Sequence, residues 1–478
     1  MTHHPEGSPL DASIAELGEA LRRRTLGVVE LTRASIERAE RTAPLNAFVG
    51  IDSEASLLAA DGLQKLLDAG HDLGPLHGIP VAMKDNIAIR GRGMAAGSRI
   101  LANNVATTDA TVTTRLKRGG AVLVGRTNLH EFAWGGTTDN PHFGRCHNPW
   151  DRDRIPAGSS GGSGVAVAVG AVPASLGTDT GGSVRLPASM NGVTGIRPTI
   201  GRVSTTGVFP LAWSLDTVGP LARSSDDCAT VLQQIGGYDP LDDVSREAPL
   251  GDLARDIDLP LAGMRIAILR DYSLRGLQPG VERAMRAILN LLRDAGALVE
   301  ELTLPHLDEL VDAQIVIDAA EPSAVHQRWL RERPEDYGRD VRLLLEAGLR
   351  FSAVDYIQAQ RYRAALREAM TDVFRRVDVV LTPTIPFTAP RFDQLNVPVG
   401  EDDTDILDGN MVFTALPSLT GTPAISLPIG MDENGLPVGL QAVAAPFAEH
   451  VLFRFGHALQ QLTDWHRLRP PLDGSAGE

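Results

Sequence analysis

Cysteine, secretory-type apolar segments and membrane-spanning runs are all scarce in this 478-residue sequence. The two cysteines, Cys146 and Cys228, are too few to cross-link a secreted chain of this length, which favours a reducing compartment. The N-terminal segment is polar and lacks the apolar core of a secretory signal. The longest nearly apolar stretch, 165–176, contains Gly170 and Pro173 and is shorter than the roughly 20 residues that a bilayer span needs. We therefore predict a cytoplasmic protein with no membrane contact.

Basic side chains are also in the minority: 45 Lys and Arg face 60 Asp and Glu, a formal net charge of −15. Nucleic acids and anionic membranes are bound through basic surfaces, so this balance argues against both as partners. Metal-binding patterns are missing too. His130-Glu131 lacks the second histidine of a zinc helix, and the acidic segment 401–405 has the composition of a solvated loop. We expect no metal and no organic cofactor.

Apolar spacing predicts helices joined to buried strands. The hydrophobic share of 43% and the charged share of 22% are typical of a globular protein with a large core. Residues 14–40 have helical spacing on either side of Gly27. A strand at 264–269, a helix with Val281 and Met285 on its apolar face, and a strand at 298–304 follow each other. That order favours parallel pairing with a right-handed crossover.

Part of the same sheet should be antiparallel. Asn434-Gly435 stands between the apolar runs 424–429 and 437–444, and Asn-Gly is a strong hairpin signal. We therefore predict an α/β fold built on one large mixed β-sheet with helices on both faces. This replaces the three domains that length alone suggests at about 150 residues per domain.

Glycine makes up 48 residues and is dense in two clusters, 156–164 and 176–187. The apolar run 165–172 between them must be buried, so the clusters are not flexible linkers. Neither matches a phosphate-binding loop or a dinucleotide motif. Nucleophilic catalysis is the remaining interpretation, because Thr180-Gly181-Gly182-Ser183 offers bare backbone N–H groups beside a serine. Lys84, at the end of an apolar strand, would be its base if burial lowered the lysine pKa.

Three motifs then carry a family resemblance. Gly74-Pro-Leu-His-Gly-Ile-Pro-Val-Ala-Met-Lys84-Asp, Gly158-Ser-Ser-Gly-Gly-Ser and Gly177-Thr-Asp-Thr-Gly-Gly-Ser-Val-Arg185 resemble the amidase signature family in order and spacing. The similarity extends over about 13–471, which leaves 1–12 and 472–478 as flexible ends. The resemblance places the variable substrate-pocket helices at about 308–376, and its fold agrees with the mixed sheet.

The resemblance implies a Ser–Ser–Lys triad. Ser183 would be the acylated nucleophile, Lys84 the base, and Ser159, after a cis peptide bond, the bridge between them. The oxyanion would be held by backbone N–H groups of Thr180, Gly181 and Gly182. Supporting roles would go to Ser160, Asp179 and Arg185.

The function predicted from the resemblance is hydrolysis of a C–N amide-type bond through an acyl-enzyme on Ser183. The substrate would be an aryl or aliphatic amide, or a carbamate (a urethanase). The alternative is the glutamine-hydrolysing subunit of a tRNA-dependent amidotransferase. We favour the stand-alone hydrolase because residues 319–326 replace the Asn-x-x-Arg-Tyr-Asp-Gly-like stretch usual in that subunit. Partners would then be a small-molecule amide or carbamate only, with no nucleic acid and no membrane, in a monomer or homodimer.

Overall fold

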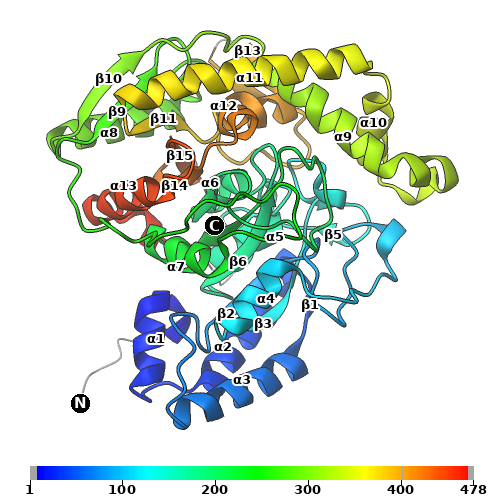
Figure 1. Ribbon diagram of the computed structural model, residues 1–478, viewed down its shortest axis with the longest axis vertical. Helices are drawn as coiled ribbons and strands as arrows, with labels where there is room; N and C mark the ends of the chain where they lie inside the picture. The colour runs from blue at the N-terminus through cyan, green and yellow to red at the C-terminus, as the bar shows by residue number, and fades with distance from the viewer. Residues whose placement is uncertain (1–7, 401, 472–478) are drawn as a thin grey trace.

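One mixed sheet of eleven strands forms the centre of the protein, in the order β1-β3-β2-β6-β8-β7-β14-β15-β11-β9-β10. The computed structural model describes residues 8–400 and 402–471 (Figure 1). The strands of this sheet are β1 (Phe48–Ile51), β2 (Pro80–Lys84), β3 (Val122–Thr127), β6 (Ala174–Asp179), β7 (Thr194–Arg197), β8 (Thr217–Ala222), β9 (Arg265–Leu269), β10 (Leu298–Leu302), β11 (Val379–Pro383), β14 (Ala424–Met431) and β15 (Pro437–Val443). Two short pairs lie apart from it: β4 (Asp139–Asn140) with β5 (Gly144–Arg145), and β12 (Asn396–Val399) with β13 (Asp402–Asp405).

Thirteen α-helices stand in the described part of the chain. They are α1 (Ile14–Arg22), α2 (Val28–Arg41), α3 (Ser53–Asp68), α4 (Thr111–Arg118), α5 (Gly161–Ala168), α6 (Arg185–Asn191), α7 (Ser225–Ile235), α8 (Pro279–Asp294), α9 (Leu310–Glu332), α10 (Arg339–Gly348), α11 (Ala353–Arg376), α12 (Ile406–Thr420) and α13 (Glu449–Leu462). None of the described helices is both long and apolar enough to cross a membrane.

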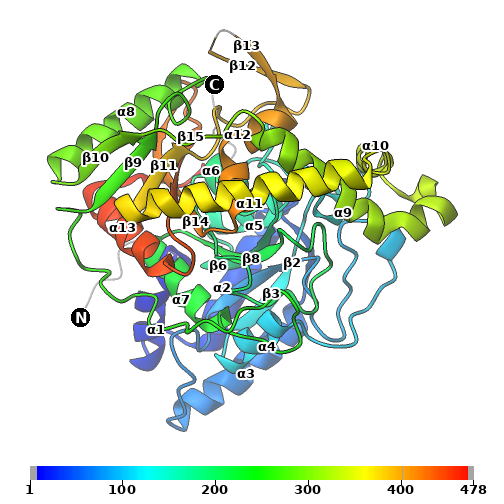
Figure 2. The same ribbon diagram turned by 45° about the horizontal axis from the view of Figure 1, so that its top comes forward.

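Helices cover both faces of the sheet, as predicted. Successive side chains of a strand point to opposite faces. In β9, Ile266 and Ile268 join the core cluster that includes α2, α5, α7, α8 and α13, whereas Ala267 and Leu269 join the cluster of α9, α11 and α12. Figure 2 shows α11 running across the second of these faces.

The predicted strand pairings are confirmed. β9 and β10 pair in parallel with α8 between them, and Val281 and Met285 of α8 are buried. β14 and β15 form the antiparallel hairpin. The helices on either side of Gly27 are α1 and α2.

The ends of the chain were predicted to be flexible at 1–12 and 472–478. Residues 1–7 and 472–478 lie outside the described residues. Within the described part, Ser8 caps a short 3₁₀ turn at Pro9–Asp11, and Leu10 is buried in the core. The limits of the family domain at 13 and 471 stay a prediction.

Candidate active site

Lys84 ends strand β2 with its amine buried in the protein. The side chain is fully buried, because β2 pairs with β3 on one side and β6 on the other. Its Nζ lies 2.7 Å from Ser159 Oγ and 2.7 Å from Thr178 Oγ1. Asn86 Nδ2 donates to the same Thr178 oxygen at 3.2 Å, so neighbouring strands fix the position of the amine.

Burial lowers the pKa of Lys84 from 10.5 to about 7. Removing an ammonium from water disfavours its charged form, and here that effect outweighs the opposing pull of the Asp179 and Asp216 carboxyl groups. Within the described residues, both hydrogen-bond partners of the Lys84 amine are hydroxyl groups rather than carboxylates. A substantial fraction of the amine is therefore neutral near pH 7 and able to accept a proton.

Ser159 and Ser160 occupy the turn that leads into helix α5. The Gly158–Ser159 peptide bond is cis. Ser160 N–H donates to the Ser183 carbonyl at 3.2 Å, which joins this turn to the second glycine loop. Gly158 is required by packing, because a Cβ there would lie 2.8 Å from the Gly135 carbonyl oxygen. The structure thus brings both glycine clusters and Lys84 to one place.

The Thr180–Ser183 loop connects β6 to α6 and faces a pocket. In the described part of the protein, the backbone N–H groups of Thr180, Gly181, Gly182 and Ser183 have no hydrogen-bond acceptor. Gly182 has φ +134°, a conformation that suits glycine. The Thr180 hydroxyl donates to Asp216 at 2.6 Å, which holds the start of the loop. The loop therefore presents four unpaired backbone donors beside the Ser183 hydroxyl.

A buried ion-pair network adjoins the Thr180–Ser183 loop and holds it in place. Asp179 accepts hydrogen bonds from Arg185 at 2.8 and 3.0 Å and from Arg197 at 3.0 Å. All three side chains are fully buried. Burial alone would raise the pKa of Asp179, but the two guanidinium groups hold it well below its usual range. Asp179 also accepts from Val184 N–H at 3.2 Å, which ties the charge network to the backbone just after Ser183.

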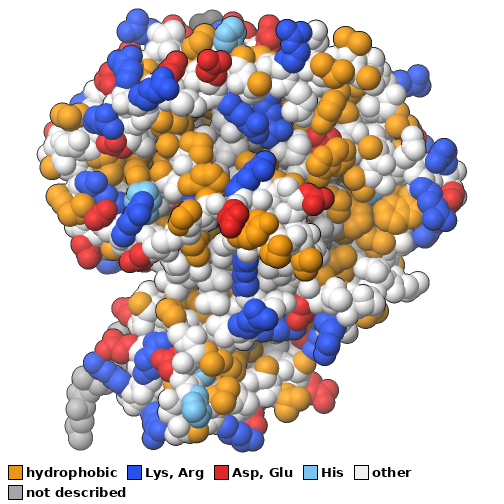
Figure 3. Space-filling model, viewed as in Figure 1, with side chains coloured by type: hydrophobic (Ala, Val, Ile, Leu, Met, Phe, Trp, Pro, Cys, Tyr) orange, Lys and Arg blue, Asp and Glu red, His pale blue; other side chains and the backbone are white. Residues whose placement is uncertain are grey.

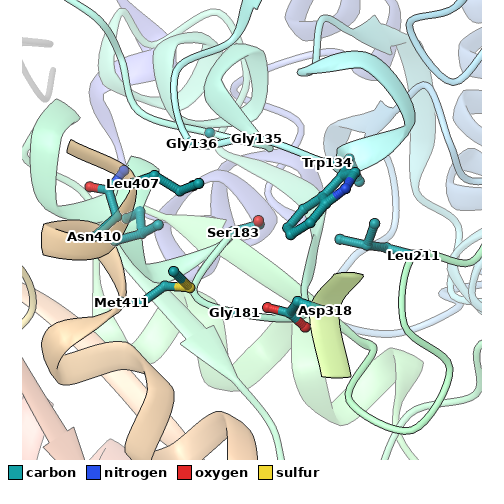
Figure 4. Close-up of a pocket in the computed structure, with 13 residues that line it drawn as sticks. Trp134, Gly135, Gly136, Gly181, Ser183, Leu211, Asp318, Leu407, Asn410 and Met411 are labelled. Carbon is teal, nitrogen blue, oxygen red and sulfur yellow. The ribbon is translucent and has the colours of Figure 1, made fainter. Parts of the chain in front are cut away.

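A small pocket with a cavity volume of about 40 Å³ lies in front of Ser183 and is partly open to solvent (Figure 4). Much of its wall is apolar and comes from Trp134, Leu186, Leu211, Leu407 and Met411. Two polar side chains that the sequence did not single out also line it, Asp318 on α9 and Asn410 on α12.

Arg363 of α11 does not line the pocket. It is buried and donates to the Leu419 carbonyl and to Ser214. Across residues 8–400 and 402–471, His, Cys, Asp and Glu side chains do not gather in groups of three or more that could hold a metal.

Comparison with known proteins identifies the family. The family model described as Amidase matches residues 30–453, which is most of the chain. The chain belongs to the amidase signature family. Its members act on carbon–nitrogen bonds of amides, and the prediction that this protein is an amide-bond hydrolase is confirmed at that level. The predicted fold is confirmed too, since the eleven-stranded mixed sheet is shared with solved structures of this family.

Individual relatives differ in what their names say. A protein of Cupriavidus necator, named as the A subunit of glutamyl-tRNA(Gln) amidotransferase, is 38% identical over 497 residues, covering 96% of this chain and 98% of its own. A chain from a vestigial protein complex, described as revealing the origins of an s-triazine catabolic enzyme, is 33% identical with a TM-score of 0.90, covering 94% of this chain and 98% of its own. A bacterial aryl acylamidase is 25% identical with a TM-score of 0.88, covering 97% and 100%.

These relatives correct the predicted partners. We expected a small-molecule amide or carbamate alone, no nucleic acid, and a monomer or homodimer. That prediction is wrong, because the 38% identical relative is named as one component of a multi-chain enzyme for a transfer RNA. The net charge of −15 was a poor guide to nucleic-acid partners, because it is a sum over the whole chain. It shows neither where the charges lie on the surface nor what other subunits contribute. On the face drawn in Figure 3, basic and acidic side chains are interspersed.

Proposed function

We propose that the protein cleaves amide bonds through an acyl-enzyme formed on Ser183. The observation that carries this proposal is the 2.7 Å separation of Lys84 Nζ and Ser159 Oγ, inside the protein and next to the Ser183 loop. A serine hydroxyl is a weak nucleophile until a base takes its proton. A lysine amine with a pKa of about 7 is suited to be that base near neutral pH.

In the proposed reaction the Ser183 oxygen attacks the amide carbon while its proton passes to Ser159. The Ser159 proton passes in turn to the neutral Lys84 amine. The carbonyl oxygen becomes an oxyanion, held by backbone N–H groups of the Thr180–Ser183 loop. The same relay run backwards gives the proton to the departing amine, and the C–N bond breaks. Water activated by the relay then hydrolyses the ester and restores Ser183.

Three further residues are proposed to position this machinery. Asp179 and Arg185 hold the loop through the buried ion pair and through the Val184 N–H bond. Ser160 links the two glycine loops through its backbone, and its hydroxyl donates to the Thr178 carbonyl at 3.2 Å. None of these three is required to accept a proton.

A serine-directed fluorophosphonate tests the nucleophile without knowledge of the substrate. Mass spectrometry of the digested protein should locate the label on Ser183, and Ser183→Ala should abolish it. Ser159→Ala should slow labelling by at least about 100-fold, because the relay is interrupted. Ser163→Ala is the matched control: its hydroxyl is also buried near α5 but bonds Thr127 and the Leu176 carbonyl. Label on another residue, or Ser159→Ala labelling as fast as Ser163→Ala, would refute the assignment.

A second proposal concerns the assembly: the chain is the glutamine-hydrolysing component of a tRNA-dependent amidotransferase in the cytoplasm. It is favoured by the relative named as such a component, which matches 96% of this chain. The two buried, free cysteines agree with a reducing compartment. Affinity purification from the native cell should recover other subunits, and ammonia release from glutamine should rise when they are present. Hydrolysis of anilides or urethanes by the isolated chain, with no glutaminase activity in either state, would favour the stand-alone amidase or urethanase instead.

A further inference from the structure

The pocket wall contains buried polar atoms that the described protein does not satisfy. Asp318 Oδ1, both amide atoms of Asn410 and the indole N–H of Trp134 have no hydrogen-bond partner among the described residues. Asp318 is 2% exposed and Asn410 is 1% exposed. Unpaired polar atoms are costly when buried, and those that face a cavity are expected to be satisfied by what binds there. The pocket is therefore built for a ligand with polar groups of its own.

Asp318 is placed against the nucleophile loop. Its Oδ2 accepts from Gln314 at 2.6 Å, and a Cβ added to Gly181 would lie only 3.1 Å from the same oxygen. Figure 4 shows Asp318 on the α9 side of the pocket, with Ser183 in the middle and Met411 and Leu211 to either side. A substrate whose carbonyl reaches Ser183 would thus extend its acyl part towards this carboxyl group.

The charges around Asp318 favour a positive ligand group. Burial raises the pKa of Asp318 to about 8, and the neighbouring Asp216 and Glu321 carboxyl groups act in the same direction. Arg197 is a cation that opposes them, but that guanidinium is engaged by Asp179 and the Leu215 carbonyl. No Lys or Arg is among the described side chains that line the pocket. Above pH 8, where Asp318 is ionised, the local charge is therefore negative, and no cation in this described wall neutralises it.

We propose that Asp318 is the specificity-determining residue of this site and binds an ammonium group on the acyl part of the substrate. The substrate class is amides whose acyl chain ends in a protonated amine, with Asn410 giving neutral hydrogen bonds beside it. The same pocket disfavours an acyl chain whose only charged end group is a carboxylate, since its described wall has no cationic side chain to pair with one. This inference rests on the proposed function, because it takes the scissile carbonyl to sit at Ser183.

Four primary amides that differ only at the far end of the acyl chain test the proposal. They are 4-aminobutanamide (ammonium), pentanamide (methyl in its place), glutaramate (carboxylate) and glutamine (ammonium and carboxylate). The measurement is the concentration of each that halves the rate of fluorophosphonate labelling of Ser183 at pH 8.5, where Asp318 is largely ionised. This readout depends on binding and not on turnover.

In the wild-type protein, 4-aminobutanamide should protect Ser183 at a concentration at least about tenfold below that of pentanamide, as expected for a hydrogen bond to a charged group. Glutaramate should protect least. Asp318→Asn should remove the preference for ammonium over methyl. Asp312→Asn, a position on the same helix that does not line the pocket, should keep it. Thermal unfolding checks that both variants are folded.

Equal protection by 4-aminobutanamide and pentanamide in the wild-type protein, or a preference that survives Asp318→Asn, would overturn the proposal. If Asp318→Asn fails to fold, the comparison of 4-aminobutanamide with pentanamide in the wild-type protein still tests the proposal. If the reagent does not label Ser183, the proposed function fails separately, and the amides are then ranked by the shift each causes in the melting temperature. Protection by 4-aminobutanamide without protection by glutamine would leave this inference standing and count against the amidotransferase proposal.

Discussion

Replacing Lys84 with methionine should remove activity and yet stabilise the protein at neutral pH. The buried amine has its pKa lowered from 10.5 to about 7, so the folded state resists a proton that the unfolded state binds readily. Methionine fills nearly the same volume with no charge to bury. The burial that destabilises the charged amine in the folded state is also what makes Lys84 a base near neutral pH.

The size of the effect follows from the pKa. At pH 7 a displacement of this size costs the folded state about 4 kcal/mol, at roughly 1.4 kcal/mol per pKa unit. Methionine loses the two hydrogen bonds to Ser159 and Thr178, worth about 1 kcal/mol each. The net expectation is that Lys84→Met is more stable by about 2 kcal/mol at pH 7.

The pH dependence separates this mechanism from simple repacking. Between pH 7 and 10.5 the unfolded lysine is protonated and the folded one is not, so wild-type stability rises with pH in this window. Lys84→Met lacks the group, and its advantage should shrink by about 2 kcal/mol from pH 7 to pH 9. Urea denaturation of both proteins at the two pH values measures this. A variant less stable than the wild type at pH 7, or an advantage independent of pH, would refute the reasoning.

Two further predictions concern the loop that carries Ser183. Asp179→Asn should lower the free energy of unfolding by about 3–5 kcal/mol, because it leaves the buried Arg185 and Arg197 without their anion; a melting temperature equal to that of the wild type would contradict this. Gly182→Ala should slow fluorophosphonate labelling at least about tenfold, because its Cβ would lie 2.9 Å from a Thr414 oxygen in a backbone region unfavourable to alanine. The control Gly62→Ala, in helix α3 with no described atom within 4 Å of the added Cβ, should label at the wild-type rate.

The helices, the strands and the mixed character of the sheet could be predicted from the sequence, because each depends on residues that are close together in the chain. Asn434-Gly435 predicts its own hairpin, and the helix around Val281 predicts a parallel pair of strands. The order of the eleven strands could not be predicted this way. β6 lies between β2 and β8, and β14 lies beside β7, through contacts between distant segments that no local spacing encodes.

The candidate site was likewise predictable only in part. Lys84, Ser159 and Ser183 stand in three separate segments, and the motifs of the family, not their spacing, indicated that they meet. Asp318 lies in the segment 308–376, where the resemblance indicates variable pocket helices and no motif singles out a residue. The spacing of polar side chains could have indicated this residue. They recur at helical spacing on the buried face of α9, at Gln314, Asp318 and Glu321. Ionisable groups are rarely buried without a partner, so such a stripe merits functional interpretation.

The most direct test of the central claim is the rate of fluorophosphonate labelling of Ser183 as a function of pH. If Lys84 is the base with a pKa of about 7, the wild-type rate should rise about tenfold per pH unit below pH 7 and level off above pH 8. Lys84→Met should label at least about 100-fold more slowly and without that inflection. A wild-type rate that does not change with pH across this range, or a Lys84→Met variant that keeps the wild-type profile, would contradict the account.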